Sequence, residues 1–195
     1  MYPMHWTMEQ YGVWERREHW GAAEVLIVFD RKGEIVDAQH VPGKILDFCW
    51  DREGDVIAIV CEKSPQLVLF DVATHQADLL ETGMGLKEFP LCCAWSPVSS
   101  VLAVGNNNGN LLIYNHVSQR RVPILGKHQR RITCCVISNQ DLIGCGSDDA
   151  SITISNVEGD TLHTFTCTAN PRQIRFSEMR VQKEDRTSSI ESCVR

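Results

Sequence analysis

The sequence has 195 residues, of which 43% are hydrophobic and 23% are charged, and its formal net charge is −6. Such a composition is ordinary for a soluble globular protein. The acidic balance argues against a general nucleic-acid-binding surface, because phosphate binding needs an excess of basic residues. No apolar run approaches the ~20 residues that span a bilayer, so no direct membrane insertion is expected.

Cysteine is frequent, with nine residues in the chain. A disulfide framework would explain such a number, but the number is odd, most of the cysteines fall inside predicted strands, and no secretory signal precedes them. We therefore predict buried, reduced thiols in a cytosolic compartment. No CxxC spacing occurs, so no zinc site is predicted. The nine are Cys49, Cys61, Cys92, Cys93, Cys134, Cys135, Cys145, Cys167 and Cys193.

Residues 1–23 do not fit the pattern of strands that follows, although three of the five tryptophans lie in this segment. The segment lacks both the alternation of a strand and the continuous apolar core of a signal peptide. We predict a non-repeat leader that is loosely helical or flexible. An aromatic docking motif is the alternative interpretation of its tryptophans.

Residues 24–42 are predicted to form the end of a four-stranded unit, here called a blade. Glu24–Phe29 would be its third strand and Glu34–Gln39 its fourth. The two inner strands are expected to be missing from the sequence before residue 24. A third strand without its inner neighbour would expose a row of free backbone groups.

Three complete blades are predicted over residues 44–81, 91–125 and 132–167, and a partial one over 172–192. Each complete blade has four apolar or β-branched runs, too short for helices and separated by turn residues. The expected strands are Ile45–Trp50, Val56–Val60, Leu67–Phe70 and Gln76–Leu80; Leu91–Trp95, Val101–Val104, Leu111–Tyr114 and Val117–Leu125; Ile132–Ile137, Leu142–Cys145, Ser151–Ser155 and Leu162–Cys167; and Arg172–Phe176, which would begin the last blade.

The blades recur at a fixed spacing. The third strands end at Asp30, Asp71, Asn115 and Asn156, which lie 41, 44 and 41 residues apart. A period of about 40–45 residues with four strands in each unit is typical of WD-repeat β-propellers. The sequence therefore predicts an all-β fold: a partial WD-repeat propeller of three complete and two partial blades over residues 24–192. Two open edges would make the isolated chain marginally stable.

Residues 146–156 resemble the WD-repeat consensus around the turn between the second and third strands. In such repeats an Asp in that turn bonds a His in the loop entering the blade, and a Ser or Thr and a Trp complete a buried network. Asp149 and His128 match this pair, which implies a structural clamp on the turn. Cys145 stands where the Ser is expected and Ser155 where the Trp is expected. The turn and third-strand positions hold Asn108 and Tyr114 in residues 91–125, and Ser64 and Phe70 in residues 44–81.

An enzymatic interpretation has only the Cys145–His128 pair behind it. A catalytic thiol needs an activated and accessible environment, which a buried strand cysteine lacks. No Gly-rich phosphate loop, HExxH or GxSxG motif occurs. We predict that the chain is not an enzyme and that it has no catalytic, cofactor-binding or metal-binding residues.

Basic residues cluster between positions 120 and 131. A strand of about six residues would separate Arg120 and Arg121 from Lys127, Arg130 and Arg131 by roughly 20 Å. We therefore expect the two groups to lie at opposite ends of a blade rather than to form one anionic-ligand site. Lys127, Arg130 and Arg131 could still contact an acidic partner.

Longer strings of residues carry a resemblance to a particular family. Residues 24–192 resemble the N-terminal propeller of the large WD-repeat and helical-repeat subunit of intraflagellar transport complex A, the subunit numbered one hundred and forty-four. The strings that carry the resemblance are Phe29–Gly33, Gly54–Val56, Glu62–Ser64, Leu102–Gly105, Gly109–His116, Leu125–His128, Arg131–Cys134, Glu158–Thr161 and Asp185–Ser188.

The resemblance implies a non-enzymatic scaffold of retrograde ciliary transport that acts in cilium assembly and ciliary receptor trafficking. It implies other complex A subunits and ciliary cargo adaptors as partners, and a place in the cilium, the basal body and the cytoplasm or cytoskeleton. The second propeller and helical tail of the family plan are not in the sequence, so a truncated form is expected. The bare WD pattern equally allows an adaptor of another assembly, such as a vesicle coat or a ubiquitin ligase. The partner-facing residues are unknown.

Overall fold

The computed structural model describes residues 5–6, 11–17, 24–83, 85 and 87–176. Every regular element in these residues is a β-strand, and the strands form four antiparallel sheets of four. Blade 1 contains β1 (His5–Trp6), β2 (Tyr11–Arg17), β3 (Glu24–Asp30) and β4 (Ile35–Val41). Blade 2 contains β5 (Ile45–Trp50), β6 (Val56–Cys61), β7 (Gln66–Asp71) and β8 (Gln76–Glu81).

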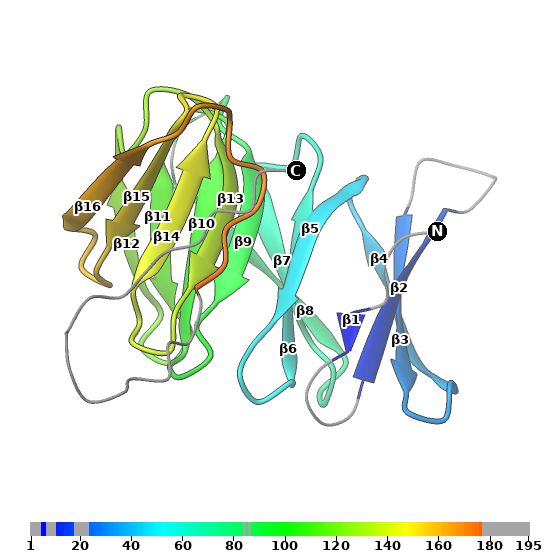
Figure 1. Cartoon of the computed structure of the whole chain (residues 1–195). Helices are drawn as coiled ribbons and strands as arrows, with labels where there is room; N and C mark the ends of the chain where they lie inside the picture. The colour runs from blue at the N-terminus through cyan, green and yellow to red at the C-terminus, as the bar shows by residue number, and fades with distance from the viewer. Residues whose placement is uncertain (1–4, 7–10, 18–23, 84, 86, 177–195) are drawn as a thin grey trace.

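Blades 3 and 4 follow the same plan. Blade 3 contains β9 (Pro90–Trp95), β10 (Val101–Asn106), β11 (Leu111–Asn115) and β12 (Arg120–Ile124). Blade 4 contains β13 (Ile132–Ile137), β14 (Ile143–Ser147), β15 (Ser151–Ser155) and β16 (Thr161–Thr166). Within each sheet the strands pair in chain order, and the four sheets stand next to one another like blades of a fan (Figure 1). The predicted all-β fold class, a partial WD-repeat propeller, is confirmed.

The core lies between blades rather than inside any one of them. In β6 every residue is buried, because successive side chains of a strand point to opposite faces and both faces are covered. Ile57 and Ile59 pack against blade 1, whereas Ala58 and Val60 pack against blade 3. The outermost strands face water, and all six residues of β16 are exposed. Each blade therefore depends on its neighbours to bury its apolar surface.

The inner edges of the blades meet along one side of the fan. The first strand of blade 3, β9, lies beside both β5 and β13. The first strands carry fewer fully buried residues than the second strands, which sit deeper between the sheets. None of the described residues forms a helix long and apolar enough to cross a membrane.

The structure corrects the expectation that residues 1–23 contribute no strands to the first blade. β2 pairs with β3 along its whole length, from Tyr11 opposite Asp30 to Arg17 opposite Glu24, and β1 pairs with β2. The physical reason lies in β3, whose residues Glu24–Val28 are buried and whose backbone groups need a partner on the inner edge. Residues 1–4, 7–10 and 18–23 lie outside the described residues.

The expectation of a strand at Arg172–Phe176 is also wrong. This segment is extended but is paired with no strand among the described residues, and it runs beside β13 (orange in Figure 1). Ile174 is buried against Ile152 and Ile154 of blade 4, and Thr133 Oγ1 donates a hydrogen bond to the Pro171 carbonyl oxygen at 2.5 Å. The segment is thus held by side-chain packing on the outer face of blade 4. The rest of the predicted last blade, 177–192, lies outside the described residues.

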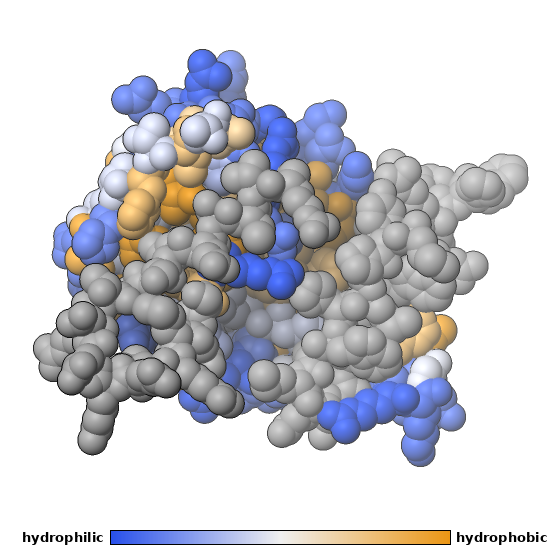
Figure 2. All heavy atoms as spheres, in the orientation of Figure 1, coloured by the Kyte–Doolittle hydropathy of each residue, from blue (hydrophilic) through white to orange (hydrophobic). Residues whose placement is uncertain are grey.

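The outer face of blade 4 carries apolar side chains besides those under this segment. Figure 2 shows apolar residues (orange) gathered over the sheet of β13–β16. Half-buried apolar residues there pack around Ile152, Ile154 and Ile174: Cys134, Val136, Leu142, Cys167 and Phe176.

Gly105 allows blades 3 and 4 to approach closely. A Cβ added at this position in β10 would lie 2.5 Å from Ile132 Cγ2 of blade 4 and 2.9 Å from Cys92 Sγ. Ile132 is fully buried, so it has no free space into which to move. A glycine is required here for packing, not for an unusual backbone angle.

Gly105→Ala should therefore destabilise the chain by about 1–3 kcal/mol, the usual cost of overpacking a core. In an ordinary strand interior, replacing Gly by Ala raises the free energy of unfolding by about 0.5–1 kcal/mol. A packing requirement at Gly105 and an ordinary strand position therefore predict changes in stability of opposite sign. Urea denaturation followed by fluorescence measures the difference. Thr164→Ala, on the exposed strand β16, is the control and should change stability by less than about 0.5 kcal/mol. A stabilised Gly105→Ala variant would contradict the proposed contact.

Candidate functional site

His128 makes three polar side-chain contacts in the predicted motif. It sits in the loop that enters blade 4, with 5% of its surface exposed. Its Nδ1 lies 3.1 Å from Asp149 Oδ2 and 3.1 Å from Ser151 Oγ, and its Nε2 lies 3.0 Å from Thr153 Oγ1. The predicted His128–Asp149 contact is therefore confirmed.

The partners on each side assign the protons of this network. Asp149 Oδ2 can only accept when ionised, so Nδ1 of His128 carries the proton and Nε2 accepts from the Thr153 hydroxyl. The backbone N–H of Gln129 donates to Asp149 Oδ2 at 3.0 Å, and Ser151 Oγ donates to Asp149 Oδ1 at 2.6 Å. The Asp149 carboxylate thus ties the entering loop to the turn between β14 and β15.

Ionisation states in the network follow from burial and these hydrogen bonds. Burial lowers the pKa of His128, and the neighbouring Asp149 opposes that shift only in part. Partial burial raises the pKa of Asp149, but hydrogen bonds from Ser151 and Gln129 and the contact with His128 outweigh it and leave the pKa below its ordinary value. A neutral imidazole therefore faces a carboxylate. With both ring nitrogens engaged and the ring buried, the arrangement clamps a turn and leaves no free base.

The sequence predicted that this network would be only half present, because Cys145 and Ser155 stand where a Ser and a Trp are expected. In the structure Ser151 and Thr153 supply further partners of His128. Thr153 lies on β15, two residues before Ser155 on the same face of the strand. The signal that could have found it is its hydroxyl at a buried strand position. The Ser155 hydroxyl is fully buried, and none of the described residues lies within hydrogen-bonding distance of it.

Cys145 is not placed to act as a nucleophile. Its side chain is fully buried, and its Sγ lies 3.8 Å from Cys135 Sγ. Burial raises the pKa of Cys61 and of Cys134 to about 11, so these thiols stay protonated near neutral pH. The eight cysteines among the described residues are free thiols, four of them buried and four half-buried, and Cys193 lies outside those residues. Those residues contain no group of three or more potential metal ligands.

In blade 3, different residues tie the entering loop to the turn between β10 and β11. Glu88 occupies the entering loop, and its carboxylate accepts hydrogen bonds from the side-chain amides of Asn106, Asn108 and Asn110 at 2.7, 3.1 and 2.8 Å. Asn108 was expected in this turn, but Glu88 was missed because a lone Glu in a polar loop gives no sequence signal. One carboxylate holding three amides ties the loop to the turn as the His128–Asp149 pair does in blade 4.

The basic residues between 120 and 131 have separate local surroundings. Lys127 Nζ donates to the Gly159 carbonyl oxygen at 3.0 Å and to Thr161 Oγ1 at 2.7 Å, and its burial lowers its pKa. Arg131 pairs with Asp148. Arg120, at the start of β12, instead borders a pocket. These residues do not share one anion site.

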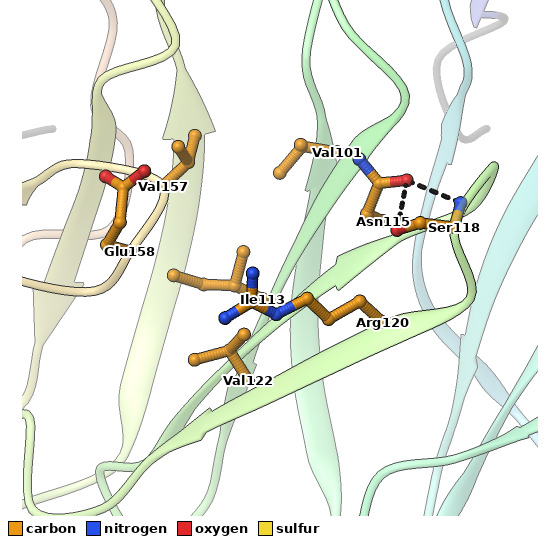
Figure 3. A pocket seen from close by; sticks show the side chains of 8 residues that line it. All are labelled: Val101, Ile113, Asn115, Ser118, Arg120, Val122, Val157 and Glu158. Atoms are coloured by element: carbon orange, nitrogen blue, oxygen red, sulfur yellow. Dashed lines mark hydrogen bonds between the residues drawn. The ribbon is translucent and has the colours of Figure 1, made fainter.

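That pocket lies between blades 3 and 4 and has a volume of about 180 Å³. Its apolar wall consists of Val101, Ile113 and Val122 from blade 3 and Val157 from blade 4, and its polar rim of Asn115, Ser118, Arg120 and Glu158. Figure 3 shows the Arg120 side chain reaching toward Ile113 and Val122, with Glu158 on the opposite side. Ser118, Arg120 and Glu158 are exposed, so the pocket opens to the surface.

Comparisons with known proteins agree with the propeller architecture. The protein family described as the WDR19 first beta-propeller matches residues 13–195. WD repeat-containing protein 19 of Homo sapiens is 40% identical over 174 residues, covering 89% of this chain. WD repeat-containing protein dyf-2 of Caenorhabditis elegans is 37% identical over 159 residues, covering 81% of it. The chain spans only 13% and 12% of the length of these two curated relatives.

A solved structure described as the mitotic checkpoint complex contains a chain of the same fold. The TM-score is 0.68 over 85% of this chain and 49% of the other, at 14% sequence identity. Identity at this level relates the fold alone.

The ionisation of His128 predicts how stability depends on pH. Because its pKa is lowered on folding, the unfolded chain binds a proton at this site more readily than the folded chain does. Stability should therefore fall as the pH drops below the unfolded-state value of about 6.5. His128→Gln removes this titration, so its stability should fall less steeply between pH 7.5 and pH 5, although it is lower at pH 7.5. Urea denaturation at several pH values tests this, and parallel curves for the two proteins would contradict it.

Proposed function

The chain belongs to the family of the WDR19 first beta-propeller, and on that basis we propose that it is a non-enzymatic protein-interaction scaffold of intraflagellar transport complex A. Its role would lie in retrograde ciliary transport, cilium assembly and ciliary receptor trafficking. Its partners would be other complex A subunits and ciliary cargo adaptors, without binding to nucleic acid or insertion into a membrane. Its location would be the cilium, the basal body and the cytoplasm or cytoskeleton.

The observation that carries the proposal is the family match over residues 13–195, together with the longer strings of the sequence that resemble the complex A subunit. The geometry of the predicted motif adds support. The two nitrogens of His128 are engaged inside the protein, and the Cys145 thiol is buried. Both are used to build a blade, which suits a protein that acts by presenting surfaces.

We also propose that the blades belong to one propeller domain that begins before residue 24. The pairing of β2 along the whole of β3 supports this boundary, as does a family match that starts at residue 13. The non-repeat leader is then shorter than the 1–23 expected from the sequence.

Affinity capture from ciliated cells tests the function directly. The tagged 195-residue chain should recover complex A subunits, identified by mass spectrometry, because the blades would present the surfaces that the assembly uses. Recovery of vesicle-coat or ubiquitin-ligase subunits instead would favour the alternative adaptor class and contradict the proposal.

A misfolded chain needs its own control in this experiment. Leu102 is fully buried between blades 2 and 3, so Leu102→Asp places an unpaired carboxylate in the core and should unfold the chain. This variant should recover chaperones alone. If the original chain gives the same result as Leu102→Asp, although circular dichroism shows it folded, then the proposed membership of complex A is wrong.

A further inference from the structure

Near the end of the third strand of blades 2, 3 and 4, one side chain faces the preceding blade. In blade 2 this residue is Phe70, packed in the core shared with blade 1, and in blade 3 it is Tyr114, packed in the core shared with blade 2. Both are almost fully buried. Blade 4 has Ser155 at the equivalent position, on the face that contacts blade 3. One aromatic ring is therefore absent from the third of three equivalent interfaces.

The neighbours of this position are smaller in blade 4 as well. In blade 3, the ring of His116 packs edge-on to Trp95 and to Tyr114, with centroids 5.9 and 6.0 Å apart. The residues equivalent to Trp95 and His116 are Ile137 and Val157 in blade 4. Three rings between blades 2 and 3 thus correspond to one hydroxymethyl group and two aliphatic side chains between blades 3 and 4.

The apolar wall of the pocket includes residues equivalent to those that share a core with Tyr114 between blades 2 and 3. Its wall includes Val101 and Ile113, and the equivalent residues of blade 2, Val56 and Leu69, share a core with Tyr114. Its volume of about 180 Å³ is that of a single ring site, since a cavity of ~150 Å³ lined by apolar side chains holds benzene. Both size and position fit one aromatic side chain.

The polar groups at the mouth favour a ring with a polar tip. The Arg120 guanidinium reaches over the apolar wall (Figure 3), where it can stack on the face of an aromatic ring. Glu158 on the opposite rim offers a carboxylate to a phenol O–H or an indole N–H. Tyr114 shows the same pattern in its own interface, where its hydroxyl donates to Gln119 Oε1 at 2.9 Å.

From this geometry we propose that the pocket between blades 3 and 4 binds a tyrosine or tryptophan side chain supplied by a partner protein. The partner's ring completes an interface that the chain itself completes in its other two positions with Phe70 and Tyr114. The assignment of the ring to a protein, rather than to a free small molecule, rests on the proposed scaffold function. The aromatic chemistry of the site stands without it.

Direct binding of capped amino acids tests the chemistry. Methyl NMR spectra of the full chain should shift on titration with N-acetyltryptophanamide or N-acetyltyrosinamide, with the largest changes at Val101, Val122 and Val157. N-acetylleucinamide is the matched apolar probe without a ring, and it should bind at least about tenfold more weakly. Equal shifts with all three probes, or shifts centred elsewhere, would overturn the proposal.

Substitutions that place an aromatic ring of the chain itself in the pocket test the same proposal. Ser155→Tyr restores the aromatic residue that blades 2 and 3 have, so it should raise the thermal midpoint by about 2–4 °C and weaken probe binding by at least about tenfold. Val122→Trp blocks the pocket from the opposite wall and should also remove binding, even if Ser155→Tyr does not fold. Thr164→Tyr adds the same ring on exposed β16 and should leave binding unchanged. Binding that persists in a folded Ser155→Tyr or Val122→Trp chain would exclude this pocket.

Displayed peptides distinguish a protein ligand from a small molecule. A random peptide library selected on the chain, with Ser155→Tyr for counter-selection, should yield peptides that share one tyrosine or tryptophan, and replacing that residue by leucine should abolish binding. If the capped amino acids bind but no aromatic peptide is enriched, the pocket serves a small aromatic ligand and the proposal fails. This readout is independent of complex A capture, so failure of one does not imply failure of the other.

Discussion

The packing of one blade face against the next is the interaction on which this structure depends. Strands such as β6 and β10 are buried on both faces along their whole length, so removing a neighbouring blade would expose one half of their side chains. At roughly 25 cal/mol for each Å² of apolar surface, this burial is the largest stabilising contribution available to the chain. Stability is therefore shared between neighbours, and substitutions at one interface affect two blades at once.

Hydrogen bonds between adjacent blades fix their relative alignment. Apolar packing alone does not fix it, because the hydrophobic effect is non-directional. Asp141, in the turn of blade 4, accepts hydrogen bonds from the hydroxyls of Ser96 and Ser99 of blade 3 at 2.5 and 2.9 Å. Asp47 of blade 2 accepts from the backbone N–H of Cys93 at 2.9 Å. Each carboxylate reaches from one blade to the next, so the geometry of the interfaces, including any pocket between them, is held at their edges.

Most of the fold could be predicted from the sequence because the strongest signals are local. Short apolar runs, turn residues and a period of about 41–44 residues predicted every strand from residue 24 to residue 167 within a few positions. β2 was missed because Glu15, Arg16 and Arg17 do not read as a buried strand, and its pairing is dictated by β3. Of the site, the Asp149–His128 pair follows from a consensus turn. Glu88, Thr153 and the pocket depend on residues that only the packing of two blades brings together.

The pocket beside blade 4 and the His128–Asp149 clamp within that blade are connected through the stability of the interface. A sealed cavity of 180 Å³ would destabilise the chain by about 4 kcal/mol at ~24 cal/mol for each Å³, a large fraction of the stability of a typical domain. This pocket opens to water between Arg120 and Glu158, which reduces the cost, and the His128–Asp149 clamp holds the same blade at its turn. Blade 4 can therefore keep its position against blade 3 without an aromatic residue at Ser155. A fold that fills this position in two interfaces and leaves it open in the third has a place for a ring from outside the chain.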